Sequence, residues 1–145
     1  MSDTSASTPP LRRWLCENAA DTRAANGPDG RIYTAPFART WDALRRDVAA
    51  RRGWSLAHAD EDLGMLTVRC RSPVFRFVDD LTIWVILDEN GLTRVEARSC
   101  SRTGRGDFGV NRRRIVRLLQ RLDRRLGQGA RIAGRGETAR TRHTA

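Results

Sequence analysis

The first clear pattern of apolar residues in the chain has a helical period and predicts an amphipathic helix over Phe37–Arg52. Trp41, Leu44 and Val48 recur at spacings of i, i+3 and i+7, which places them on one face of a helix. Gly53 follows directly, and glycine is the residue that most often ends a helix at its C-terminal side. One side of this helix should therefore pack against another layer of the protein.

After this helix the apolar period changes to two, which is typical of half-buried antiparallel strands. The most apolar run in the chain, Leu81–Leu87, follows Phe75–Asp80 and predicts a central strand. Asn90-Gly91 is typical of a tight hairpin turn and separates that run from a last strand. The predicted strands are Ile32–Thr34, Trp54–Ala59, Met65–Arg71, Leu81–Leu87 and Leu92–Ser101.

A second helical pattern predicts a helix over about Asp107–Leu126, with Asp107 as its N-cap and Gly127 at its end. Its two faces differ sharply in chemistry. The apolar face consists of Ile115, Leu118, Leu119, Leu122 and Leu126, and the opposite face carries Arg113, Arg117, Arg121 and Arg124. This helix should bury its leucines against the same surface as the first one.

The resulting order of elements, β-α-β-β-β-β-α, predicts the α+β class. Hairpin-linked strands form an antiparallel sheet, here of four to five strands, and both helices are expected on one face of it. We expect residues 1–30 to be a flexible leader, residues 31–127 the single domain, and residues 128–145 a disordered basic tail. The composition of the two ends offers too little apolar surface to offset the entropy of ordering.

The positive charge of the protein is concentrated in its last third. Residues 97–145 contain 14 Arg and 3 acidic residues, a net charge of +11, whereas the whole chain carries +10. The chain has no lysine, even in its neutral segments, which favours a compositional origin over selection for forked phosphate contacts. If this segment binds a polyanion, binding should be salt-sensitive and non-specific. No aromatic residue follows Phe108, so this third by itself offers no platform for base stacking.

The three cysteines have no paired spacing, and the two histidines lie far from them in the sequence. This pattern predicts neither a disulfide framework nor a zinc site, and we expect no metal and no cofactor. Residues 1–20 lack the apolar core of a signal peptide, and no apolar run is long enough to span a bilayer. These observations predict a cytoplasmic protein without a membrane span.

Three stretches of sequence resemble a bacterial family known as domain of unknown function 1499. They are Ala35–Leu44, Phe75–Asp80 and, most specifically, Arg98–Arg112. The resemblance covers about Ile32–Leu126 and implies a domain boundary and a motif list, but no activity. The order of strand, helix and hairpins also loosely resembles helix-grip-like domains, an analogy of fold that carries little functional weight.

The segment Gly104–Gly109 matches the GxGxxG pattern of dinucleotide-binding loops. A dinucleotide fold needs a further parallel strand and an acidic residue after the helix, and neither follows here. A weaker hypothesis remains, because free N–H groups at a helix start favour anions. The candidate anion site in the loop 102–112 and beside it consists of Arg98, Arg102, Arg105 and Arg112. The alternative is that Asp107 caps the helix while the glycines only turn the chain.

Asp79 and Asp80 are adjacent in a strand, so their side chains should point to opposite faces and should not form a catalytic pair. We expect one of them to pair with Arg98 or Arg102 and the other to meet solvent. The rest of the last motif is interpreted as a structural network that holds the last strand to the last helix. The predicted members of this network are Asp79, Asp80, Ser99, Ser101, Gly104, Asp107, Gly109 and Asn111.

The sequence therefore favours a non-enzymatic binding or scaffold protein with an anion site at the loop 102–112. The alternative is non-specific binding of nucleic acid or another polyanion through the Arg-rich C-terminal third. An enzyme built on Asp79 or Asp80 ranks last, because no nucleophile accompanies them and His58 is the only histidine outside the tail. The partner, protein or polyanion, stays open.

Overall fold

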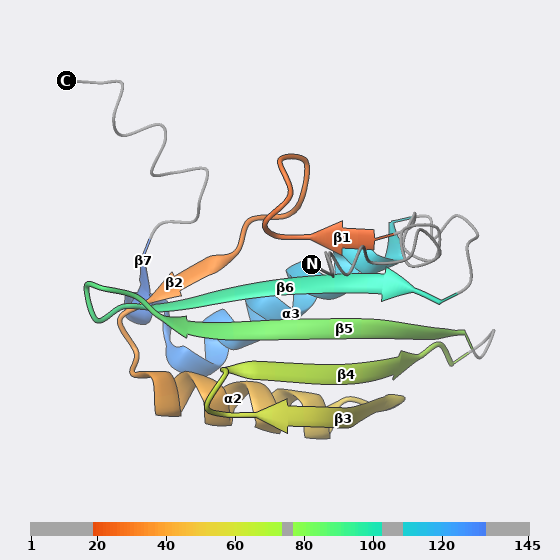
Figure 1. Ribbon diagram of the computed structural model, residues 1–145, viewed down its shortest axis with the longest axis horizontal. Helices are drawn as coiled ribbons and strands as arrows, with labels where there is room; N and C mark the ends of the chain where they lie inside the picture. Colours follow the sequence, from red (N-terminus) through yellow and green to blue (C-terminus); the bar gives the residue numbers. More distant parts are fainter. Residues whose placement is uncertain (1–18, 74–76, 103–108, 133–145) are drawn as a thin grey trace, which may run out of the picture.

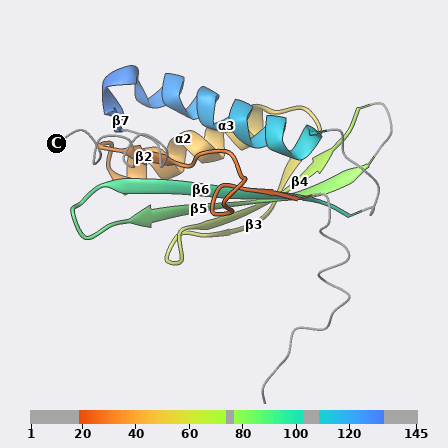
Figure 2. The same ribbon diagram turned by 90° about the horizontal axis from the view of Figure 1, so that it is seen from above.

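An antiparallel sheet forms one layer of the protein, and helices cover only one of its faces (Figures 1 and 2). The computed structural model describes residues 19–73, 77–102 and 109–132. In these ranges the sheet has seven strands. They are β1 (Ala19–Asp21), β2 (Arg31–Tyr33), β3 (Trp54–Asp60), β4 (Met65–Arg71), β5 (Val78–Leu87), β6 (Thr93–Ser101) and β7 (Arg131–Ile132). The helices are α2 (Phe37–Ala50), α3 (Val110–Leu126) and the short 3-10 helix η1 (Gln128–Ala130).

The strands lie in the order β3-β4-β5-β6-β2-β7, and β1 pairs with the remaining part of β6. The α+β class and the placement of both helices on one face are confirmed. The predicted count of four to five strands is too low because β1 and β7, with three and two residues, are too short to show a period in the sequence. No described helix has the length and apolarity needed to cross a bilayer.

The core lies between the sheet and the two helices. On the sheet side it contains alternate residues of β4, β5 and β6, such as Leu66, Ile83 and Val95, which are fully buried. The predicted apolar stripes of both helices face them and are confirmed as buried. Burying a side chain of this size contributes about 1.5–3 kcal/mol. In the same core, burial raises the pKa of the Cys70 thiol to about 12, so the thiol stays protonated at neutral pH.

The Asp123 carboxylate links α3 to the short strands β2 and β7. Its carboxylate accepts hydrogen bonds from the Tyr33 hydroxyl at 2.6 Å and from Arg31 Nε at 3.1 Å, and Arg131 lies 3.6 Å away. Burial and the hydrogen bond to Asp123 both raise the pKa of Tyr33. These contacts and the β2–β7 pairing extend the ordered domain to Ile132, past the boundary predicted at residue 127.

The segment 19–30, predicted as part of the leader, belongs to the folded domain. β1 pairs residue by residue with Arg98–Cys100 of β6, and β2 pairs with an earlier part of the same strand. The chain between them makes a turn over the edge of β6 (Figure 1). Composition failed to reveal this because the segment is held mainly by hydrogen bonds to β6, and its only described contact with the hydrophobic core is made by the small side chain of Ala20.

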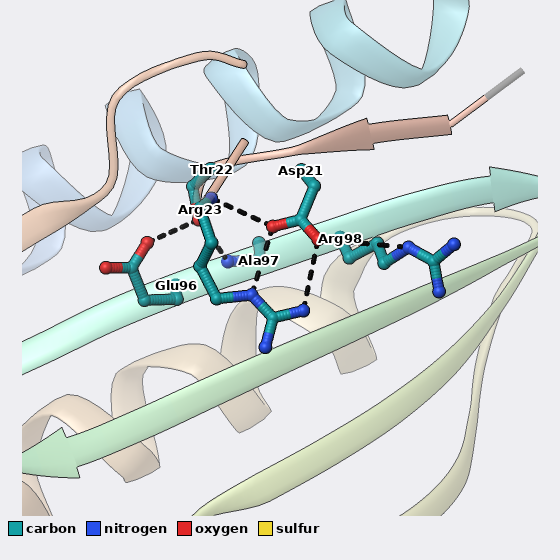
Figure 3. A network of polar contacts seen from close by, with 6 residues as sticks. All are labelled: Asp21, Thr22, Arg23, Glu96, Ala97 and Arg98. Atoms are coloured by element: carbon teal, nitrogen blue, oxygen red, sulfur yellow. Dashed lines mark hydrogen bonds and ion pairs between the residues drawn. The ribbon is translucent and has the colours of Figure 1, made fainter. Parts of the chain in front are cut away.

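Thr22 is the centre of these hydrogen bonds (Figure 3). Its hydroxyl donates to the carboxylate of Glu96 and accepts from the backbone N–H of Ala97 at 3.0 Å, while its own N–H donates to the Ala97 carbonyl. Glu96 is only 5% exposed although it lies on the face of the sheet that no helix covers. A Cβ atom at Gly30 would lie 2.5 Å from this carboxylate and 2.9 Å from the backbone carbonyl oxygen of Val95, so the close approach of the turn requires glycine.

Asp21 and Arg23, at the start of this turn, form an ion pair (Figure 3). The Arg23 guanidinium donates to both carboxylate oxygens of Asp21 at 3.0 and 3.1 Å and lies 4.0 Å from the ring centre of Trp84. Partial burial raises the pKa of Asp21, but the hydrogen bonds and charge of Arg23 outweigh it and leave that pKa below its ordinary value.

We expect Thr22→Val to lower the free energy of unfolding by about 1–3 kcal/mol, the usual cost of a buried polar group that loses its hydrogen bond. Urea denaturation measures this change. Thr34→Val is the matched control, because Thr34 is exposed and the one hydrogen bond of its hydroxyl among the described residues is to the Ala130 carbonyl at 3.3 Å. The control should stay within about 0.5 kcal/mol of the native protein. Equal losses in both variants would contradict a special role for Thr22.

Candidate anion-binding groove

A groove lined by arginines runs between the start of α3, the end of α2 and the first residue of β3. Its volume is about 360 Å³. We call it the arginine groove. Its lining residues are Arg51, Trp54, Val110, Arg113, Arg114, Arg117 and Arg121.

The start of α3 explains why several of these arginines lie together. Gly109 is the N-cap residue with φ of +77°, a left-handed conformation that glycine adopts most easily. The first turn that follows contains no acidic residue and carries Arg112, Arg113 and Arg114 instead. Cations at this end oppose the helix dipole, and the positive potential that results favours an anion. The helix thus begins in strongly positive surroundings.

Arg114 is held in place by a buried polar network. Its guanidinium donates to Asp79 Oδ2 at 2.7 Å, to Ser99 Oγ at 2.9 Å and to Asn111 Oδ1 at 2.8 Å. The side chains of Arg114 and Asp79 are 11% and 9% exposed. A buried carboxylate and guanidinium with these contacts form a charge-assisted pair in one geometry. Arg114 therefore reaches the groove with little freedom to move.

The same network joins the end of β6 to the start of α3. Ser99 Oγ donates to Asn111 Oδ1 at 2.7 Å, and Asn111 Nδ2 donates to Ser101 Oγ at 2.8 Å. All three residues are buried. Buried hydroxyl and amide groups are costly unless they are paired, so these contacts restrict where the helix can begin.

A second buried carboxylate holds Arg121. Asp47 of α2 has no exposed surface, and both of its oxygens accept hydrogen bonds from Arg121 at 2.9–3.0 Å. The Arg121 guanidinium also lies 5.5 Å from the centre of the Trp54 ring, within the range of a cation–π contact. Arg125 approaches the same carboxylate at 3.4 Å. The ion pair links α2 to α3 and orients both Arg121 and Trp54 toward the groove.

The remaining arginines of the groove are not neutralised. In the described ranges, no carboxylate lies within ion-pair distance of Arg51, Arg113 or Arg117. The Nε atom of Arg51 is buried and has no hydrogen-bond partner there. A buried N–H donor without an acceptor is unfavourable. The guanidinium groups that line the groove carry further N–H donors, which can bind an anion. The site is therefore suited chemically to oxyanions such as phosphate.

The family model that matches this chain is described as a protein of unknown function, DUF1499, and the match covers residues 15–122. The chain belongs to the DUF1499 family. The resemblance seen in the sequence is confirmed, and its start moves from about residue 32 to residue 15, so that β1 is included. No curated protein and no solved structure matches the chain. Because the family description names no activity, the function of this DUF1499 domain has to be argued from its site.

The arginines predicted as an anion site do not converge in the described part of the DUF1499 domain. Arg98 and Arg102 lie on the uncovered face of the sheet, where they face Asp21 at 3.9 Å and Asp80 at 2.9 Å. Arg112 lies on α3 and donates to the Asn26 carbonyl at 3.0 Å. Arg105, Gly104 and Asp107 lie outside the described residues.

Asp79 and Asp80 point to opposite faces of the sheet, as expected from their adjacent positions. The predicted ion pair is confirmed, because Arg102 donates twice to the Asp80 carboxylate at 2.9 Å. The expectation that the other carboxylate meets solvent is wrong. Asp79 is 6% exposed and pairs with Arg114, since α3 covers its face of the sheet.

Three features of the site were not predicted from the sequence: Asp47, Trp54 and the inward side of α3 that carries Arg114 and Arg121. Arg121 was predicted on the outer face, but its side chain is only 16% exposed. One signal was available: Asp47 falls on the same helix face as Leu44, beside Val48, and an acid on an apolar stripe indicates a buried ion pair. Its partner could not be read from spacing, because it lies on another helix.

We expect Asp47→Ala to lower the free energy of unfolding by about 3–5 kcal/mol, because it leaves the largely buried Arg121 guanidinium without its counterion. Chemical denaturation followed by circular dichroism would measure the loss. Arg125→Gln removes the longer and more exposed contact to the same carboxylate and should cost at most about 1 kcal/mol. If Asp47→Ala were as mild as Arg125→Gln, the ion pair would not be holding the two helices together.

Proposed function

We propose that this domain is a non-catalytic binding protein for polyanions and that the arginine groove is its contact surface. The observation that carries the proposal is the charge balance of the groove. Five arginines line it, and the described carboxylates that pair with them are those of Asp47 and Asp79. The excess of positive charge faces a depression rather than a flat surface, which strengthens its field at the point of contact.

The arrangement of the arginines supports phosphate-bearing ligands in particular. The guanidinium fork matches the oxygens of a phosphate and can donate two parallel hydrogen bonds. Because Asp47 and Asp79 already restrain Arg121 and Arg114, less side-chain entropy is lost when an anion binds beside them. The exposed Arg113 and Arg117 supply the mobile part of the contact.

The polar groups near the groove support binding rather than catalysis. Asp79 and Asp80 do not share a site, and each carboxylate is engaged by an arginine. Ser99 both donates to Asn111 and accepts from Arg114, so among the described residues its hydroxyl is engaged by groups that cannot act as a general base. A cytoplasmic location, which the sequence favours, would bring nucleic acids within reach as the most abundant polyanions.

The test is a fluorescence-anisotropy titration of a labelled single-stranded oligonucleotide of mixed sequence at several salt concentrations. Arg113→Gln with Arg117→Gln removes two exposed charges and keeps residues that favour a helix. We expect this double variant to bind about tenfold more weakly at low salt. The slope of log K against log salt concentration should become shallower by about 1.4, because each of the two lost phosphate contacts contributes about 0.7 to it.

Arg45→Gln with Arg124→Gln is the matched control, because it removes the same charge from exposed positions outside the groove. This control should bind almost as the native protein does. Equal weakening in both double variants would show that net charge alone drives binding and would contradict the groove. An absence of binding by the native protein even at low salt would remove the proposed function.

A further inference from the structure

A second basic depression lies on the opposite face of the sheet, at the same end of the domain. Its volume is about 430 Å³. We call it the open-face depression. Its lining residues are Gly53, Trp54, Ser55, Arg69, Arg71, Val78 and Arg102. Ser55, Arg69 and Asp80 are neighbours in register across β3, β4 and β5, so they share the face that no helix covers.

The open-face depression also carries more positive than negative charge. Arg69 and Arg71 are exposed, and no carboxylate among the described residues lies within ion-pair distance of either. Arg102 is already paired with Asp80 through two hydrogen bonds. The consecutive residues Asp79 and Asp80 thus hold one arginine on each side of the sheet, Arg114 in the arginine groove and Arg102 in the open-face depression.

The two depressions meet at the edge of the sheet. Both are lined by Trp54, the first residue of β3, and β3 lies at an edge of the described sheet, where it pairs with β4 alone. At this end of the sheet β3 and β5 begin and β4 and β6 end (Figure 1). Among the described residues that line the two depressions, Trp54 is the only aromatic one.

We infer that the polyanion bound by this domain is a single-stranded nucleic acid that bends around the sheet edge at Gly53 and Trp54 and contacts both depressions. The inference rests on the proposed function and adds the class of ligand. A small anion would occupy one depression only. A duplex is too stiff to bend around an edge of this size, since its persistence length is about 150 base pairs.

The chemistry at the bend agrees with such a strand. Single-strand binding proteins combine a positively charged path for the backbone with aromatic side chains on which bases stack. Here Trp54 lies between the arginines of the two faces, and Arg121 contacts its ring. Stacking on one aromatic residue tolerates any base, so no strong sequence preference is expected.

The experiment compares three proteins on a single-stranded oligonucleotide of about 16 nucleotides, the upper site size of an OB-fold domain, and on the duplex of the same sequence. Arg69→Thr with Arg71→Thr removes the free charges of the open-face depression and places a residue that suits exposed strands. The other two proteins are the native chain and the control Arg45→Gln with Arg124→Gln. A thermal melt of each variant checks that it is folded.

We expect the native protein to prefer the single strand at equal salt, and the Arg69 and Arg71 variant to bind that strand about tenfold more weakly. The same variant should bind the duplex as the native protein does, because a duplex would use the arginine groove alone. Equal native affinities for strand and duplex would overturn the inference. Unchanged strand binding by the variant would also overturn it. The proposed function would stand in either case, because it is tested separately by the anisotropy titration of Arg113→Gln with Arg117→Gln.

Discussion

A carboxylate that is removed from water must be paired, and this requirement decides how α3 lies on the sheet. Asp79 is almost fully buried on the helix-covered face of β5, and Arg114 is the cation that compensates it at 2.7 Å. The buried carboxylate of Asp47 on α2 must also be paired, and its counterion is Arg121, which lies further along α3. The apolar stripe of α3 would tolerate small shifts along the sheet, whereas two buried ion pairs and the Ser99–Asn111 contact do not.

The position of the groove follows from this constraint. Once Arg114 and Arg121 face the sheet and α2, the arginines between and beside them on α3 are left to line the space toward Trp54. The buried carboxylates neutralise the arginines that hold the helix, and the outer arginines keep their charge. The arginines of α3 thus have two different roles: the inner ones stabilise the fold, and the outer ones are available to a ligand. The proposed polyanion site is a product of the way the helix is anchored.

The N-terminal segment shows the same principle on the uncovered face. Glu96 is buried there without a helix above it, and one of its carboxylate oxygens accepts a hydrogen bond from the Thr22 hydroxyl. Asp21 and Arg23 then close the turn over Trp84. A segment without a large apolar side chain is ordered in this way because its polar groups complete hydrogen bonds that β6 would otherwise lack.

The sequence by itself determined what depends on neighbouring residues. The helical stripe of α2, the leucine face of α3 and the alternation along β4 each recur over a few residues, and burial follows such periods directly. The placement of Asp79 and Asp80 on opposite faces is equally local, because adjacent strand residues always alternate. The motifs in the sequence were also sufficient to identify the DUF1499 family. The short strands β1 and β7 were not predicted, because two or three residues are too few to show a period.

The tertiary structure decided which distant charges meet. Asp47 and Arg121 are 74 positions apart, and Trp54 reaches the arginines of α3 only after β3 has paired with β4. The basic third of the sequence contains no aromatic residue beyond Phe108, yet in the fold it lies beside one. Such contacts depend on strand register and helix placement, which arise from the packing of the whole chain. Composition could therefore indicate a polyanion, and only the packed structure could locate the surface that would bind it.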